Sequence, residues 1–144
     1  MLKALAACRS ALAREGTLDP VLRELVWLKV AALNGCRYGL TLRYAGPRHA
    51  GATEAKIAAI DDERSDLLTS RERIAVRFAE KPAVDHHTVD DALWTEMRRH
   101  FSEAEIIGLA AHTTLYIGFG RLNENVGLDP AEGRRAVPDP WRRP

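Results

Sequence analysis

Residues 17–39 read TLDPVLRELVWLKVAALNGCRYG, and this stretch decides the fold. Asp19 followed by Pro20 marks a helix start, because the aspartate side chain caps the first N–H groups and proline has no N–H to satisfy. In VLRELVWLKVAAL at positions 21–33, apolar residues cover nearly the whole circumference, which predicts a helix buried on several sides. Asn34-Gly35 then ends that helix, since both residues tolerate the left-handed conformation at a C-cap.

The same helix-start pattern recurs further along the chain. A serine or threonine precedes four more helical stretches, three of them with an acidic residue at the position expected for a capping box. These caps are Thr53, Thr69 with Glu72, Thr88 with Asp91, and Ser102 with Glu105. We therefore expect about six helices and no sheet, an all-α fold. The expected ranges are 2–15, 20–33 continuing after a break to about 50, 53–60, 69–80, 88–99 and 102–126.

Composition narrows the class of protein. With 46% hydrophobic and 28% charged residues, the 144-residue chain is typical of a soluble domain and too apolar for intrinsic disorder. A formal net charge of +1 gives no electrostatic case for a nucleic-acid partner. No uncharged apolar run is long enough to span a membrane, so we expect no membrane partner. Two cysteines without an export signal predict a cytoplasmic protein with reduced thiols.

The apolar residues also bear on domain organisation and assembly. We expect one helical domain over residues 1–130 and an irregular tail rich in proline and arginine over 131–144. The segment IIGLAAHTTLYIGFGRL at 106–122 is a second helix with apolar residues on most sides. A chain of this size can hardly bury two such helices alone. The sequence therefore predicts a homo-oligomer.

Cys36 is the first candidate for chemistry. It falls at the start of the helix expected after Asn34-Gly35, where unpaired backbone N–H groups and the nearby Arg37 and Arg43 favour a thiolate. If that helix continues, Arg43 lies on the same face as the sulfur. The alternative is structural, because an unreactive cysteine is usually a small buried apolar side chain.

Glu24 and His112 are the other candidates. A glutamate inside an apolar helix is almost never fully buried unless paired, so Glu24 either forms an ion pair with Arg23, Lys29 or a distant arginine, or carries protons. His112 lies in the second apolar segment, as a core histidine or as a catalytic base.

The cluster DHH at 85–87 is a poor chelate, because no further ligand follows at a suitable spacing. We expect no metal and no cofactor.

Residues 17–39, together with 51–60, 69–80 and 102–130, resemble the carboxymuconolactone decarboxylase family, in particular its alkylhydroperoxidase D-like (AhpD-like) branch. The resemblance implies an all-α fold that assembles as a homotrimer or homohexamer. That branch carries Glu, eleven residues, Cys, two residues, Cys, three residues and His. In the family the first cysteine resolves, the second reacts with peroxide, and Glu and His relay protons. Here Glu24 and Cys36 match, whereas Gly39 and Arg43 replace the second cysteine and the histidine.

Three functions follow from this half-complete motif. The first is a thiol-dependent peroxidase or antioxidant, in which peroxide oxidises Cys36 and an external thiol or Cys8 resolves it. The second is a non-redox decarboxylase or isomerase of a small carboxylated substrate, with Arg43 binding the carboxylate and Glu24 or His112 moving protons. The third is a ligand-binding or scaffold oligomer that has lost catalysis.

Overall fold

The computed structural model describes residues 2–41, 43–127 and 136–137, and the chain there is almost entirely helical. The helices are α1 (Leu2–Glu15), α2 (Pro20–Leu33), α3 (Arg37–Thr41), α4 (Ala45–Ala50), α5 (Glu54–Ala58), α6 (Ser70–Val84), α7 (Asp91–His100) and α8 (Glu103–Asn125). A 3₁₀ turn, His86–Thr88, precedes α7, and two short strands, β1 (Arg43–Tyr44) and β2 (Ala136–Val137), pair in parallel. The expectation of an all-α fold is confirmed, apart from this two-residue pairing.

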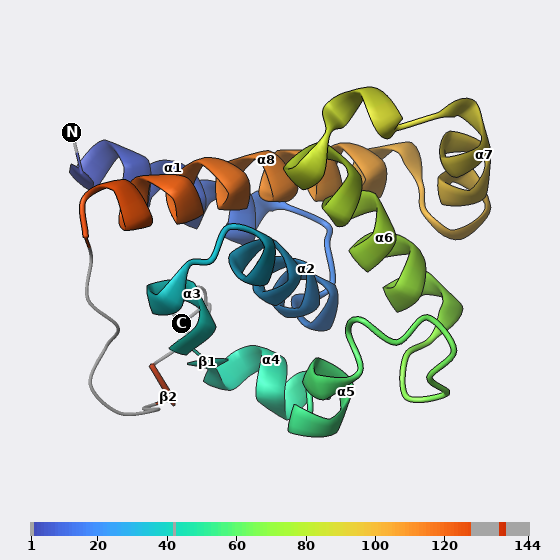
Figure 1. Cartoon of the computed structure of the whole chain (residues 1–144), viewed down its shortest axis with the longest axis horizontal. Coiled ribbons are helices and arrows are strands. Elements are labelled where there is room, and N and C mark those ends of the chain that lie inside the picture. The colour runs from blue at the N-terminus through green and yellow to red at the C-terminus, as the bar shows by residue number, and fades with distance from the viewer. Residues whose placement is uncertain (1, 42, 128–135, 138–144) are drawn as a thin grey trace.

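The buried helix α2 is the centre of the molecule. It packs against α6 and α8, while α4 and α5 lie on the opposite side of it from α8 (Figure 1). Val26 and Val30 of α2 are fully buried against Phe78 of α6 and Leu109 of α8. The prediction that α2 is buried on several sides is therefore confirmed.

The predicted helix starts are mostly confirmed by their hydrogen bonds. Asp19 Oδ1 accepts from the Val21 backbone N–H at 2.7 Å, and capping boxes form at Thr69 and at Ser102. The expected cap at Thr88 is wrong. Asp90 caps α7 instead, because the Thr88 hydroxyl already donates to the Asp85 carbonyl within the 3₁₀ turn.

The segment after α2 differs most from expectation. A helix continuing to about residue 50 was predicted, but the chain forms the two short helices α3 and α4 around β1. The turn before α3 is made by Gly35, whose φ of 62° is the left-handed conformation expected there. Of the predicted tail, only residues 136–137 lie within the described residues, and they form β2.

None of the helices described here is both long and apolar enough to cross a membrane.

Candidate functional site

A small cavity lies where α1, α2, α4 and α8 meet. It is lined by Arg9 and Ala13 of α1, Arg23, Glu24 and Trp27 of α2, Pro47 of α4, and His112 and Tyr116 of α8. Its volume is about 30 Å³, enough for one or two water molecules. Two of the four predicted site residues, Glu24 and His112, therefore line one cavity with two arginines and two aromatic rings.

Glu24 reaches this cavity because α2 is buried on the side that faces α1 and α8. The residue is 2% exposed, and Trp27 follows it three positions later, on the same helix face. Lys29, one of its predicted ion-pair partners, instead binds Asp61 at 2.7 Å and Glu80 at 2.9 Å. Lys29 is thus excluded as the partner of Glu24.

His112 is held in one orientation by its own helix. Its Nδ1 lies 2.8 Å from the Gly108 carbonyl oxygen, which can only accept, so Nδ1 carries the proton that it donates. The side chain is 3% exposed, and no hydrogen-bond partner for Nε2 is found among the described residues. In this tautomer the neutral ring carries its free lone pair on Nε2. Nε2 is therefore the basic atom of His112, which lines the cavity.

The pKa of His112 lies below its usual value. Burial is the main cause, because it disfavours the charged ring, and the positive charge of Arg23 acts in the same direction. The hydrogen bond to Gly108 opposes both effects without outweighing them. His112 is therefore a neutral base at physiological pH.

Sequence reasoning missed both arginines as site residues. Arg23 Nη1 donates to the Ala13 carbonyl at 2.8 Å, which ties α1 to α2 at the edge of the cavity. Arg23 was considered only as a partner for Glu24. No pattern in the sequence indicated that Arg9 would line the cavity, because nothing in it places α1 beside α2 and α8.

Cys36 lies in a second, smaller cavity of about 10 Å³. That cavity is lined by Trp27, Ala31, Cys36, Gly39, Tyr116, Gly120 and Asn123. The thiol is 1% exposed, and its Sγ accepts from the Gly39 backbone N–H at 3.3 Å and from Asn123 Nδ2 at 3.8 Å. The Trp27 and Tyr116 rings meet edge to face at 5.0 Å and belong to the walls of both cavities. The structure therefore assigns Cys36 to a different cavity from Glu24 and His112.

The position of the missing second cysteine is closely packed. A Cβ at Gly39 would lie 2.9 Å from Ala31 Cβ and 3.4 Å from Cys36 Sγ, and Trp27 Nε1 donates to the Gly39 carbonyl at 3.1 Å. The glycine lets α3 approach α2 closely. Cys8 is exposed on α1, and both cysteines are free thiols. The side chain of Arg43 lies outside the described part of the chain.

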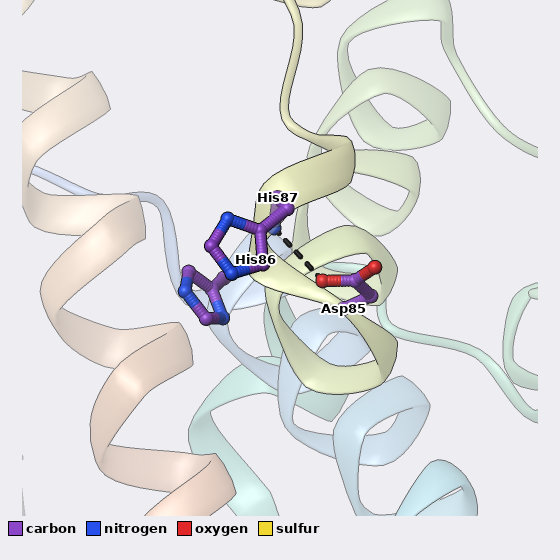
Figure 2. A group of neighbouring side chains, drawn as sticks. All are labelled: Asp85, His86 and His87. Atoms are coloured by element: carbon purple, nitrogen blue, oxygen red, sulfur yellow. Dashed lines mark hydrogen bonds between the residues drawn. The ribbon is translucent and has the colours of Figure 1, made fainter.

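Asp85, His86 and His87 are the one group within the described ranges whose donor atoms come close enough to consider a metal ion. Figure 2 shows the two imidazole rings on one side of the turn and the Asp85 carboxylate on the other, where it accepts from the His87 backbone N–H at 3.0 Å. All three residues are exposed. Their donor atoms lie within 4.8 Å of one another, but three exposed ligands on adjacent residues, one of them already bonded to a backbone N–H, make a poor chelate.

Comparison of the sequence with known proteins relates this chain to one family. A sequence model of the carboxymuconolactone decarboxylase family matches residues 1–81. The uncharacterized Escherichia coli protein YnjA is 31% identical over 128 residues, covering 88% of this chain and 69% of YnjA. An uncharacterized Mycobacterium tuberculosis protein is 38% identical over 104 residues, and the chain spans only 35% of its length.

Solved structures agree with the sequence match. A putative antioxidant defence protein AhpD from Agrobacterium tumefaciens superposes with a TM-score of 0.78 at 22% identity, covering 90% of each chain. An AhpD-core, peroxidase-related protein from Ralstonia eutropha gives 0.77 at 25% identity, covering 95% of this chain and 75% of that one. The chain thus belongs to the carboxymuconolactone decarboxylase family and has the AhpD-like fold.

Proposed function

We propose that the chain is a non-redox enzyme that moves protons on a small carboxylated substrate, in a decarboxylation or an isomerisation, with Glu24 and His112 as the proton carriers. The observation that carries this proposal is the buried Nε2 of His112, which no described group occupies, in a residue that lines the same cavity as Glu24. A base and a carboxyl group from different helices in one small cavity are the parts that general acid–base catalysis needs.

The two side chains have complementary roles. In an isomerisation one of them removes a proton from the carbon beside a carbonyl, and the other delivers a proton to a second carbon. In a decarboxylation the electron pair of the broken C–C bond stays on the substrate carbon, which then receives a proton as CO₂ leaves. Trp27 and Pro47 give the cavity apolar walls, and a substrate that displaces its water would meet stronger electrostatic interactions inside.

The test is proton NMR in D₂O with a panel of small β-keto and β,γ-unsaturated carboxylates. We expect the wild-type chain to exchange the acidic C–H proton or to release CO₂ from at least one compound. Glu24→Gln and His112→Asn should each reduce that rate by about 10²- to 10⁴-fold, the usual contribution of one acid–base group. The surface variant Arg98→Gln is the control and should leave the rate unchanged. A rate that survives both site variants would refute the assignment.

Thiol chemistry at Cys36 is a second candidate function, supported by the two donors to its sulfur. The Gly39 N–H and Asn123 Nδ2 both donate to Sγ, so two donors hold the sulfur in one position. The thiolate would attack a peroxide oxygen, so that an S–O bond forms, the O–O bond breaks, and an alcohol or water leaves. An external thiol would then attack the sulfenic sulfur, giving a mixed disulfide and water.

A sulfenic-acid trap with intact-mass detection tests this second candidate on the folded protein. An adduct that is lost in Cys36→Ser and kept in Cys8→Ser would support it. No adduct on the wild-type chain would exclude it and would leave Cys36 as a packing residue.

The proposed homo-oligomer, a trimer or hexamer, is supported by apolar side chains that α8 and its C-terminal end leave at the surface. Ile107 is 69% exposed and Val126 is 65% exposed. Light scattering at micromolar concentration tests the assembly, and a monomeric mass would contradict it.

A further inference from the structure

The cavity that holds Nε2 of His112 carries more positive than negative charge. The charged and titratable groups that face His112 there are Arg9 from α1, Arg23 and Glu24 from α2, and Tyr116 from α8, while α4 contributes only the uncharged Pro47. An arginine side chain in a protein does not lose its proton. Two fixed cations therefore oppose one carboxylate in a space of about 30 Å³.

Such a cavity favours an anion, and the planar guanidinium group matches a carboxylate in shape and in donor geometry. The two arginines come from different helices, and Arg23 is already positioned by its bond to the Ala13 carbonyl. The small volume limits the first occupant to a compact group, of the size of a carboxylate with little else attached. Trp27 and Tyr116 bound the cavity on its apolar side.

An anion bound next to Arg23 would also affect the protonation of His112. The positive charge of Arg23 is one reason why the ring stays neutral. An anion beside that guanidinium would offset its charge and remove part of the repulsion that a protonated ring meets. Anion and proton would then each strengthen the binding of the other, since coupling between two sites is reciprocal.

We propose that the cavity binds a small carboxylate between Arg9 and Arg23, and that Nε2 of His112 takes up one proton from solvent as the anion enters. This inference rests on the proposed function and deepens it. It names the residues that bind the carboxylate and the step at which His112 gains the proton that it later donates. In a decarboxylation the proton on Nε2 passes to the carbon that keeps the electron pair, CO₂ leaves neutral, and the ring returns to its free state. The proton gained on binding is the one that the reaction consumes.

Titration calorimetry with formate tests the coupling without any turnover. The measurement is made near neutral pH and constant ionic strength, in two buffers of different ionisation enthalpy. For the wild-type chain we expect the heat to differ between the buffers by an amount that corresponds to net proton uptake, up to one proton per formate. In His112→Asn that difference should disappear while formate still binds, because asparagine keeps a donor for the Gly108 carbonyl and lacks a base at the Nε2 position.

The arginine variants test the subsite itself. Arg9→Gln and Arg23→Gln should each weaken formate binding by about tenfold or more, because each removes a charge-assisted contact. The surface control Arg98→Gln should not change it. Arg23→Gln also breaks the bond to the Ala13 carbonyl, so Arg9→Gln decides the matter if the other variant fails to fold.

Three results would overturn the inference: no formate binding by the wild-type chain, binding without proton uptake, or an equal loss in Arg98→Gln. These failures are distinct from failure of the proposed function. Coupled uptake of formate and a proton by a chain that turns over no compound would uphold the subsite and contradict the activity. Turnover that depends on Glu24, without proton uptake on formate binding, would support the activity and contradict the coupled subsite.

Discussion

The side-chain amide of Asn34, at the end of α2, lies directly against the backbone of Gly120 in α8. A Cβ at residue 120 would stand 2.4 Å from Asn34 Nδ2. The same amide donates to the Ile117 carbonyl at 3.2 Å and to the Tyr116 carbonyl at 3.4 Å. This contact fixes the turn that precedes Cys36 to the helix that carries His112 and Tyr116. Both small cavities therefore depend on it.

Gly120→Ala tests that contact. The added methyl group must displace a short side chain that makes hydrogen bonds at both ends of its amide, since Arg121 Nε also donates to Asn34 Oδ1. We expect a loss of about 1–3 kcal/mol in the free energy of unfolding, as for other overpacked sites, measured by urea denaturation. Gly118→Ala is the matched control, because no neighbouring atom of the described residues lies within 4 Å of its Cβ position. It should be neutral or stabilising by up to about 1 kcal/mol from helix propensity. Equal effects of the two variants would contradict the packing argument.

The stability of the protein should depend on pH through His112. Its pKa in the folded state is lowered by burial and by Arg23, so below its ordinary value of about 6.5 the unfolded chain binds the proton more readily than the folded chain. The stabilising contribution is complete above that value and is lost as the pH falls toward the folded-state pKa. A single group changes stability by at most about 1.4 kcal/mol per pH unit in this window.

Thermal denaturation between about pH 5 and pH 8 measures this effect. His112→Asn should flatten the curve in this range, whereas His49→Asn, which changes an exposed histidine, should leave it as in the wild-type chain. A curve that keeps its slope in His112→Asn would show that another group is responsible.

A second pH effect should come from Glu72 at the start of α6. Burial raises the pKa of this carboxyl group, but hydrogen bonds from Lys56 and from Thr69 outweigh burial and lower it overall. The pair is stabilising above the unfolded-state pKa of Glu72 and loses its effect as the pH falls through the folded-state value.

Glu72→Gln isolates the charge in that interaction, because glutamine can still close the capping box with Thr69. We expect the variant to be less stable than the wild-type chain by about 1–2 kcal/mol at neutral pH. The two should converge in acid, once the pH has fallen through the lowered pKa of Glu72 and the wild-type carboxyl group is itself protonated. Urea denaturation at neutral and at acid pH measures this, and a difference that persists in acid would point to lost packing instead of lost charge.

Local sequence patterns predicted the helices because their causes are local. Asp19-Pro20 starts α2 and Gly35 ends it through interactions within a few residues, so no knowledge of the tertiary fold was required. The helix expected to run toward residue 50 failed for the opposite reason. Pairing of β1 with β2, about ninety residues further along the chain, competes with helix formation there and leaves no mark in the local sequence.

The candidate site was predictable only in part, for the same reason. Glu24 and His112 stood out because each is a polar residue in an apolar helix, which requires an explanation wherever the helix packs. Nothing local showed that Trp27 would form a wall between their cavity and that of Cys36. Arg9 became a site residue only because α1 packs beside α8, a contact between the first and the last of the described helices (Figure 1).

The substitution Gly39→Cys would restore the family motif in part. Since a Cβ at residue 39 would lie 2.9 Å from Ala31 Cβ, the new side chain must push α3 away from α2, where Trp27 bonds the residue 39 carbonyl. We expect Gly39→Cys to lower the free energy of unfolding by about 1–3 kcal/mol. Gly118→Cys, at an open position, should change it little.

Adding Ala31→Gly tests the cause of that loss, because it removes the methyl group that the new side chain would strike. Although glycine inside α2 costs about 1 kcal/mol, the double variant should then be no less stable than Ala31→Gly alone. Intact mass after mild oxidation shows whether residues 36 and 39 form a disulfide. A stable single variant that forms this disulfide readily would mean that the close approach of α3 to α2 is not what excludes the second cysteine.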